Sequence, residues 1–333
     1  MAGDVLVLVE HDGGEADELS LQALALARGY AAATGGALDT VLIGAGGRAA
    51  ADELGARGVV AVHVASHEAL DDPGAYAPDA WAATLCELVA RLAPAAVIAA
   101  GSDRGNEVLA RTAARLELPM AANCTRAAPS GAVATLTRLR WGGSLLEEAE
   151  LEGSPALLTV APHAVALEPA GAGGAVAEID DFAPALSDAD LRVRVRERVA
   201  AGGGGVSLSD ARVVVSGGRG VGSAEGFAVV EELAALLGAA IGCSRAVTMA
   251  GWRPHSDQVG QTGTKIAPEL YIPCGISGAT QHMAGCKGAK RLLAVNPDPE
   301  APIFASADYA VIGDLHEVLP AISAAITQAR EAR

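Results

Sequence analysis

The residues best suited to chemistry lie between positions 245 and 282, where hydroxyl and amide side chains, arginines and histidines alternate with glycines. Residues 258–263, with the sequence QVGQTG, offer backbone N–H groups, two side-chain amides and a hydroxyl in one short stretch. A buried helix does not tolerate this spacing of glycine and polar residues. The alternating donors and acceptors suit the edge of an isoalloxazine ring, so this segment predicts a flavin site.

A strand followed by a turn comes directly downstream. Residues 270–274 (LYIPC) have the composition of a short buried strand, and residues 275–282 (GISGATQH) lead into a helix. Such a turn points free N–H groups and the positive end of the helix dipole outward. We therefore expect an anionic or carbonyl-rich part of the ligand at this turn.

A second glycine-rich turn, residues 217–223 (GGRGVGS), follows a predicted strand and precedes a predicted helix. A P-loop is disfavoured because Ser223 follows Gly222 and the required lysine is missing. The dinucleotide fingerprint also fails at Ser223, and the next strand ends in Ser244-Arg245, where NAD-binding folds place an acid. The turn predicts a nucleotide pyrophosphate but not NAD; the alternative is a tight turn with a solvated Arg219.

Two domains are expected, because 333 residues are about twice the length of a typical domain. With 51% hydrophobic but only 3% aromatic residues, the core must consist of Ala, Val and Leu, as in α/β proteins. For residues 1–199 we expect a nucleotide-hydrolase-like α/β domain with a parallel sheet. Its first expected elements are a strand over 5–9 and helices over 15–34 and 49–55, and its last is a strand meander over 132–167. The glycine run in residues 200–206 predicts a linker, and residues 207–333 predict a doubly wound FAD-binding domain.

The net charge and the spacing of the cysteines restrict the expected partners and the expected cellular compartment. A net charge of −16 argues against nucleic acid or an anionic membrane as the main partner. The five cysteines are scattered without metal-ligand or C-x-x-C spacing, which predicts free thiols in a reducing compartment and no metal site. No run approaches the ~18 apolar residues of a membrane span, and the start lacks a basic leader, so we expect a cytoplasmic protein.

A series of motifs resembles the alpha subunits of electron transfer flavoproteins. The motifs are SGGRGVGSAEGF, SR, AGW, QVGQTG, APELYI, GISGATQH and VNPDPEAPIFASADYAVIGDL, in this order. The match is dense from position 213 to about 320 and looser over the first domain, where VLVLVEH at positions 5–11 is compatible with the family's usual opening. The resemblance implies one FAD, held mainly by the second domain of this chain.

The resemblance also implies roles for single residues. Arg219 would neutralise the FAD phosphates and Ser244 would lie against the cofactor. Arg245 would lie against the flavin ring, Thr262 would meet flavin N5, and His282 would lie beside the pyrimidine carbonyl, although alone a loop threonine is more often a turn former and a single histidine more often structural. Asn296, Asp314 and Leu315 would surround the adenosine end, and Asp314 also has the position of a helix N-cap. The remaining expected contacts are Gln258, Val259, Gly260, Gln261, Ser277, Gly278, Ala279, Thr280 and Gln281.

As a function, the resemblance implies an electron carrier without substrate turnover of its own. It would pair with a beta subunit containing AMP, accept electrons from acyl-CoA or related dehydrogenases, and pass them to a membrane quinone oxidoreductase in connection with fatty acid beta-oxidation. No residue set suggests a general base or an activated nucleophile. The alternatives are the alpha subunit of an electron-bifurcating, NADH-oxidising flavoprotein and a nucleotide-binding regulatory module.

Three segments depart from the family's usual pattern. Thr248-Met249 stands where an Asp commonly precedes Ala-Gly-Trp, Arg253 replaces an apolar residue, and residues 284–288 (AGCKG) replace a more usual Ala-Gly-Met segment that would lack Cys286. These positions are expected around the flavin ring or a partner surface. They bear on the redox potential and on the choice of partner rather than on the identity of the cofactor.

Overall fold

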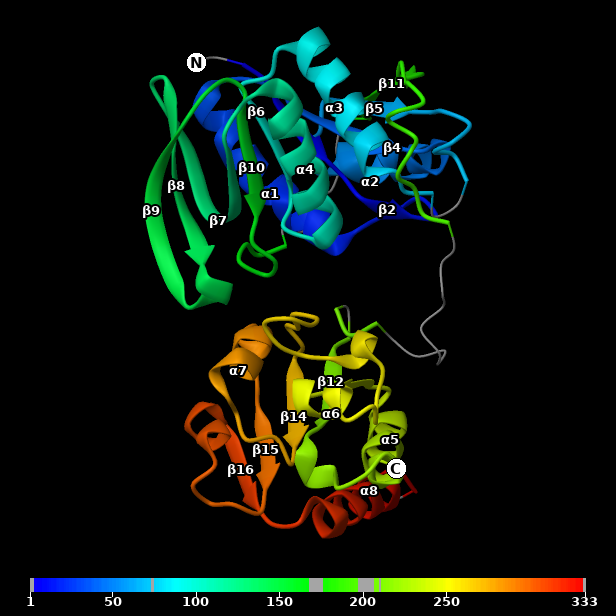
Figure 1. The fold of residues 1–333 in the computed structure, drawn as a ribbon, viewed down its shortest axis with the longest axis vertical. Coiled ribbons are helices and arrows are strands. Elements are labelled where there is room, and N and C mark those ends of the chain that lie inside the picture. Colours follow the sequence, from blue (N-terminus) through cyan, green and yellow to red (C-terminus); the bar gives the residue numbers. More distant parts are fainter. Residues whose placement is uncertain (1–2, 73–74, 168–175, 197–206, 210, 332–333) are drawn as a thin grey trace. The chain divides into compact units, whose positions relative to one another are not determined.

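The computed structural model describes residues 3–72, 75–167, 176–196, 207–209 and 211–331. The chain forms two compact units, Met1–Val199 and Ala200–Arg333. The predicted linker 200–206 lies outside the described residues. Both units are built on largely parallel sheets with helices, which confirms the predicted α/β class with two sheets (Figure 1).

The first unit contains a nine-stranded sheet in the order β11-β5-β4-β1-β6-β10-β7-β8-β9. Its strands are β1 (Val5–Leu8), β4 (Leu38–Ile43), β5 (Ala61–Ala65), β6 (Ala96–Ala100), β7 (Met120–Ser130), β8 (Val133–Arg140), β9 (Leu145–Glu152), β10 (Ala156–Val160) and β11 (Glu178–Phe182). The helices are α1 (Glu18–Thr34), α2 (Ala51–Ala56), α3 (Pro78–Leu92) and α4 (Asp103–Leu116). Strands β1, β4, β6 and β10 are buried along their whole length, as expected for a parallel sheet covered on both faces.

Two helix predictions in this unit need correction. The helix predicted over 15–34 begins only at Glu18, because Asp17 is its N-cap and accepts hydrogen bonds from the N–H groups of Leu19 and Ser20. Glu15–Ala16 (β3) instead pairs with His11–Asp12 (β2) in a short hairpin. The helix predicted over 49–55 corresponds to α2 (Ala51–Ala56) and needs correction only at its start, where residues 49–50 belong to a preceding 3₁₀ helix, Ala45–Ala50.

The predicted meander over 132–167 is only partly correct. Strands β7, β8 and β9 pair antiparallel and extend the sheet at one edge. Strand β10, however, returns to the sheet interior and lies parallel between β6 and β7 (Figure 1). All five residues of β10 are buried, so its uninterrupted apolar sequence ALLTV suits a central strand better than a meander edge.

The second unit contains a five-stranded, wholly parallel sheet in the order β13-β12-β14-β15-β16. Its strands are β12 (Val213–Gly217), β13 (Ala240–Cys243), β14 (Leu270–Cys274), β15 (Leu293–Asn296) and β16 (Tyr309–Ile312). The helices are α5 (Ala228–Leu237), α6 (Arg245–Met249), α7 (Thr280–Cys286) and α8 (Leu315–Glu331). Apolar residues of α5 and α8 form one core with the sheet, and those of α7 join the core on its other face.

The order of these strands creates a switch point between β12 and β14. The chain leaves β12 toward β13 on one side and returns to β14 on the other side. In open parallel sheets, ligands bind in the crevice outside the carboxyl ends of the strands at such a point.

Across the described residues, no helix is long and apolar enough to cross a membrane.

Candidate functional site

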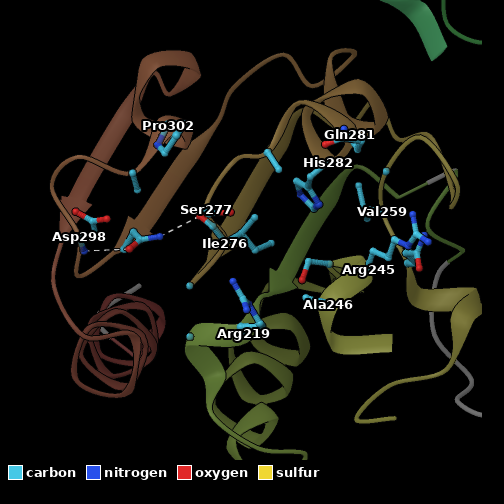
Figure 2. A pocket seen from close by; sticks show the side chains of 18 of the residues that line it. Arg219, Arg245, Ala246, Val259, Ile276, Ser277, Gln281, His282, Asp298 and Pro302 are labelled. Atoms are coloured by element: carbon cyan, nitrogen blue, oxygen red, sulfur yellow. Dashed lines mark hydrogen bonds between the residues drawn. The ribbon is translucent and has the colours of Figure 1, made fainter. Parts of the chain in front are cut away.

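A cavity of about 590 Å³ lies at the carboxyl ends of the strands in the second unit. Each of four neighbouring strands brings one polar wall residue: Arg219 comes after β12, Ser244 after β13, Ser277 after β14, and Asn296 ends β15. Figure 2 shows that the cavity is elongated, with Arg245 and His282 toward one end and Asp298 and Pro302 toward the other. An extended ligand such as a dinucleotide suits this shape.

The middle of the cavity floor is formed by two glycine loops in backbone contact. The Gly220 N–H donates to Gly275 O at 3.1 Å, and the Gly218 N–H donates to Cys274 O at 2.8 Å. A Cβ atom at Gly220 would lie 2.7 Å from Gly275 Cα, so no other residue fits without moving the backbone. Both of these N–H groups have protein acceptors, and the Arg219 side chain is the charged group that this turn brings to the cavity.

The turn after β14 behaves differently. Ile276, Ser277 and Ala279 line the cavity, and in the part of the chain that the structure describes their N–H groups have no acceptor. The carbonyl groups of this turn are used, because Ile276 O accepts from Asn296 Nδ2 at 3.0 Å and Ser277 O accepts from the Ile303 N–H at 3.0 Å. The turn therefore has the free N–H groups that the sequence predicts for a ligand with anionic or carbonyl oxygens.

Two arginines give the cavity its positive charge. Arg219 and Arg245 are both exposed on its wall, and neither has a carboxylate within ion-pair distance in the described ranges. Arg253, by contrast, is paired with Glu231 at 2.5 Å and with Asp257 at 2.8 Å. Two unpaired guanidinium groups in one cavity of a chain with a net charge of −16 indicate an anionic ligand.

His282 is buried beside the cavity and paired with Tyr271. Its Nε2 atom lies 2.7 Å from the Tyr271 hydroxyl, and burial lowers the pKa of His282 to about 4, with the Val259 backbone acting in the opposite direction. Burial also raises the pKa of Tyr271 well above its ordinary value, so both side chains are neutral near pH 7. The Nδ1 atom is buried and makes no other hydrogen bond to a described residue than its interaction with the Val259 backbone.

At the other end of the cavity, Asn296 joins two loops. Its Nδ2 donates to Ile276 O, and its Oδ1 accepts from the Asp298 N–H at 3.0 Å. These two bonds fix the loop that carries Asp298 and Pro302 onto the turn after β14. Asn296 therefore shapes this end of the cavity as well as lining it.

Most of the residues singled out from the sequence meet in this one cavity. Those on its wall are Arg219, Ser244, Arg245, Gln258, Val259, Gly260, Gln261, Thr262, Ser277, Ala279, Gln281, His282 and Asn296. They come from five separate segments between positions 219 and 296. Their convergence supplies a neutral histidine, amides, three hydroxyls and two cations, a set that fits both the ring and the phosphates of FAD.

Four predicted contacts do not line the cavity. Gly278 has φ +84°, and a Cβ there would lie 2.4 Å from Ile303 N, so this glycine serves the close approach of two loops. Thr280 is the exposed first residue of α7. Asp314 accepts a hydrogen bond from the His316 N–H at the start of α8, and Leu315 is buried in the core formed with α5 and α8.

The structure adds wall residues that the sequence reasoning missed, namely Gly220, Ala246, Gly275, Ile276, Pro297, Asp298, Ala301 and Pro302. The last four belong to the motif VNPDPEAPIF, so the signal was present, but only Asn296 in it was singled out. Tyr271 was assigned only to a buried strand. Its contact with His282 could not be foreseen, because apolar composition alone does not show where the hydroxyl lies.

Comparisons with known proteins identify the family of the chain. The family model "Electron transfer flavoprotein FAD-binding domain" matches residues 207–287, and "Electron transfer flavoprotein domain" matches residues 5–187. The chain is 38% identical to the electron transfer flavoprotein subunit alpha of Mycobacterium leprae, covering 96% of this chain and 97% of the relative. It is 35% identical to the subunit alpha of Megasphaera elsdenii (97% and 96% covered) and 35% identical to Protein FixB of Clostridium saccharobutylicum (98% and 96%).

The two family models fall in the two units of the chain, and the model named for FAD binding covers the strands, turns and arginines of the cavity as far as residue 287. The sequence relatives extend over nearly the whole chain. The chain belongs to the family of electron transfer flavoprotein alpha subunits.

Proposed function

We propose that the chain is the FAD-carrying alpha subunit of a heterodimeric, cytoplasmic electron transfer flavoprotein. It would accept electrons from acyl-CoA or related dehydrogenases and deliver them to a membrane quinone oxidoreductase, as part of fatty acid beta-oxidation. The beta subunit would carry AMP. The observation that carries this proposal is the elongated cavity with two unpaired arginines, within the part of the chain that matches an FAD-binding domain.

Different residues of the cavity would bind different parts of FAD. Arg219, near the middle, would neutralise the pyrophosphate, and the loop fixed by Asn296 would receive the adenosine end. Arg245, Thr262 and His282 would surround the ring system and set its redox potential. Bound FAD supplies the electron-transfer chemistry, and the protein supplies binding, orientation and electrostatics.

A partner is expected to close the site. The cavity wall has exposed residues, so the second unit by itself leaves one side of the ligand open to solvent; these residues are Arg219, Arg245, Gln261, Thr262 and Gln281. We expect the beta subunit to provide the missing wall, with contacts to the first unit as well. In the first unit, the tip of the β8–β9 hairpin presents Trp141 and Leu146 with 79% and 69% of their surfaces exposed, which is typical of a protein interface.

Nucleotide extraction from the complex co-expressed with its beta subunit tests this proposal. The expected content is one FAD and one AMP per heterodimer. Two FAD would instead indicate an electron-bifurcating complex, and the absence of flavin would indicate a nucleotide-binding module. Arg219→Gln should reduce the FAD content, while Arg291→Gln, a matched change at an exposed arginine outside the cavity, should leave it unchanged.

A further inference from the structure

A chain of hydrogen bonds runs behind the cavity wall from Thr248 through Gln258 to Thr262. Gln258 Nε2 donates to Thr262 Oγ1 at 3.0 Å, and Gln258 Oε1 accepts from Thr248 Oγ1 at 2.8 Å. Gln258 and Thr262 line the cavity, whereas Thr248 lines a smaller hollow that shares Arg245, Gln258 and Thr262 with the cavity wall. Thr248 is not on the cavity wall itself, and Gln258 is the wall side chain to which it is hydrogen-bonded.

The direction of this chain decides what Thr262 offers to a ligand. A hydroxyl has one proton to donate and two lone pairs that accept. Because Thr262 Oγ1 accepts from Gln258, its own proton is not used by the glutamine, and it has no other acceptor in the part of the chain described. If the Gln258 amide were rotated by half a turn, Oε1 would face Thr262. The Thr262 hydroxyl would then donate its proton to Oε1 and not into the cavity.

Among the described residues, the Thr248 hydroxyl is the side-chain partner of Gln258 Oε1. Gln258 is only 2% exposed, so water cannot readily substitute for a lost partner of Oε1. The Gln258 backbone is fixed as well, because its N–H donates to His255 O at 3.0 Å and its carbonyl accepts from the Thr264 N–H at 2.7 Å. The amide can still rotate, and its rotation would break the hydrogen bond from Thr248 to Oε1. The Thr248 hydroxyl also donates to Arg245 O at 2.9 Å, so its one proton has two acceptors.

We propose that Thr248 is a positioning residue that, through Gln258, keeps the hydroxyl proton of Thr262 directed into the cavity. This inference rests on the proposed function, because the acceptor of that proton is the bound flavin. Thr248 belongs to a segment in which this sequence departs from the family's usual pattern. The redox potential of this protein would thus depend on a residue that does not touch the cofactor.

The test is a set of Thr248 variants in the FAD-loaded complex with the beta subunit, with both one-electron reduction potentials measured by spectroelectrochemistry. Thr248→Val and Thr248→Ala should lower the first potential, because a hydrogen bond donated to the ring stabilises its more electron-rich state. The loss of one such bond should shift this equilibrium by about threefold to tenfold, or ~30–60 mV. Thr248→Ser should restore the wild-type value, with FAD content unchanged throughout.

A matched control is Thr327→Val in α8, where the lost hydroxyl also donates to a helix carbonyl but lies outside the cavity. It should leave both potentials unchanged. Wild-type potentials in Thr248→Val and Thr248→Ala, a rise instead of a fall, or a failure of Thr248→Ser to restore the value would each overturn the inference. A wild-type complex without FAD would overturn the proposed function itself, and so the two failures are distinguishable.

Discussion

Arg245 and His282 lie toward the same end of the cavity but offer a ligand different things (Figure 2). Arg245 is an exposed guanidinium group and has no carboxylate partner among the described residues. His282 is buried, neutral near pH 7 and held by Tyr271. Under the proposed function, the first would supply charge to the ring, and the second would supply a fixed hydrogen-bonding atom.

Replacing Arg245 by Leu should therefore lower the reduction potential of the bound FAD. A positive charge near the ring stabilises its reduced, more negative form, and a tenfold loss of that preference corresponds to ~59 mV for one electron. Arg291→Leu removes a charge at a surface ion pair and serves as the control. Equal potentials in the Arg245 variant and the control would place Arg245 away from the ring.

His282 should titrate near pH 4 rather than near 6.5. Between these values the unfolded chain binds a proton at this residue and the folded chain does not. Its contribution to stability is thus complete above pH 6.5 and is lost as the pH falls toward 4, by roughly 3 kcal/mol. An NMR titration of the His282 ring checks this directly, and a pKa near 6.5 would show that the ring is solvated.

At the residue scale, the sequence was informative where polar residues and glycines cluster, as in residues 258–263, since such clusters are rarely needed for packing. It was uninformative where a role depends on a contact across the fold. Tyr271 is one case, because the pairing with His282 joins β14 to α7. Thr248 is another, because its hydroxyl meets Gln258 across a turn.

At the scale of elements, alternating apolar segments predicted most strands and helices of both sheets, but not how the strands pair. Strand β10 is an example of what could not be predicted. Its apolar sequence indicates that it is buried, but its position between β6 and β7 depends on long-range strand pairing. The start of α1 shows another limit. Asp17 as N-cap overrides the apolar pattern that placed the helix at residue 15.

We expect the exposed tip of the β8–β9 hairpin to contact the beta subunit. A double variant, Trp141→Ser with Leu146→Ser, should weaken association with the beta subunit by roughly 2 kcal/mol, or about 30-fold, if these exposed side chains anchor the interface. Val60→Ser, at an apolar residue that is 56% exposed elsewhere in the first unit, is the control. Sedimentation of diluted complexes measures the effect, and dissociation equal to that of the control would exclude the hairpin from the interface.

At the scale of the whole molecule, the two units have different tasks in our account. The second unit holds the cavity and matches the FAD-binding domain, while the first has no predicted cofactor contacts and offers the exposed hairpin. The division into sheets follows from the sequence, because each half repeats strand and helix signals. The relative placement of the subunits does not, since it depends on the beta chain.

The central claim is that the cavity in the second unit holds FAD. A density map of the FAD-loaded heterodimer tests it most directly. We predict density along the cavity, with the ring system beside Arg245, Thr262 and His282, the pyrophosphate at Arg219, and the adenosine end toward Asn296 and Asp298. A flavin bound elsewhere in the complex, with this cavity filled only by solvent, would contradict the account.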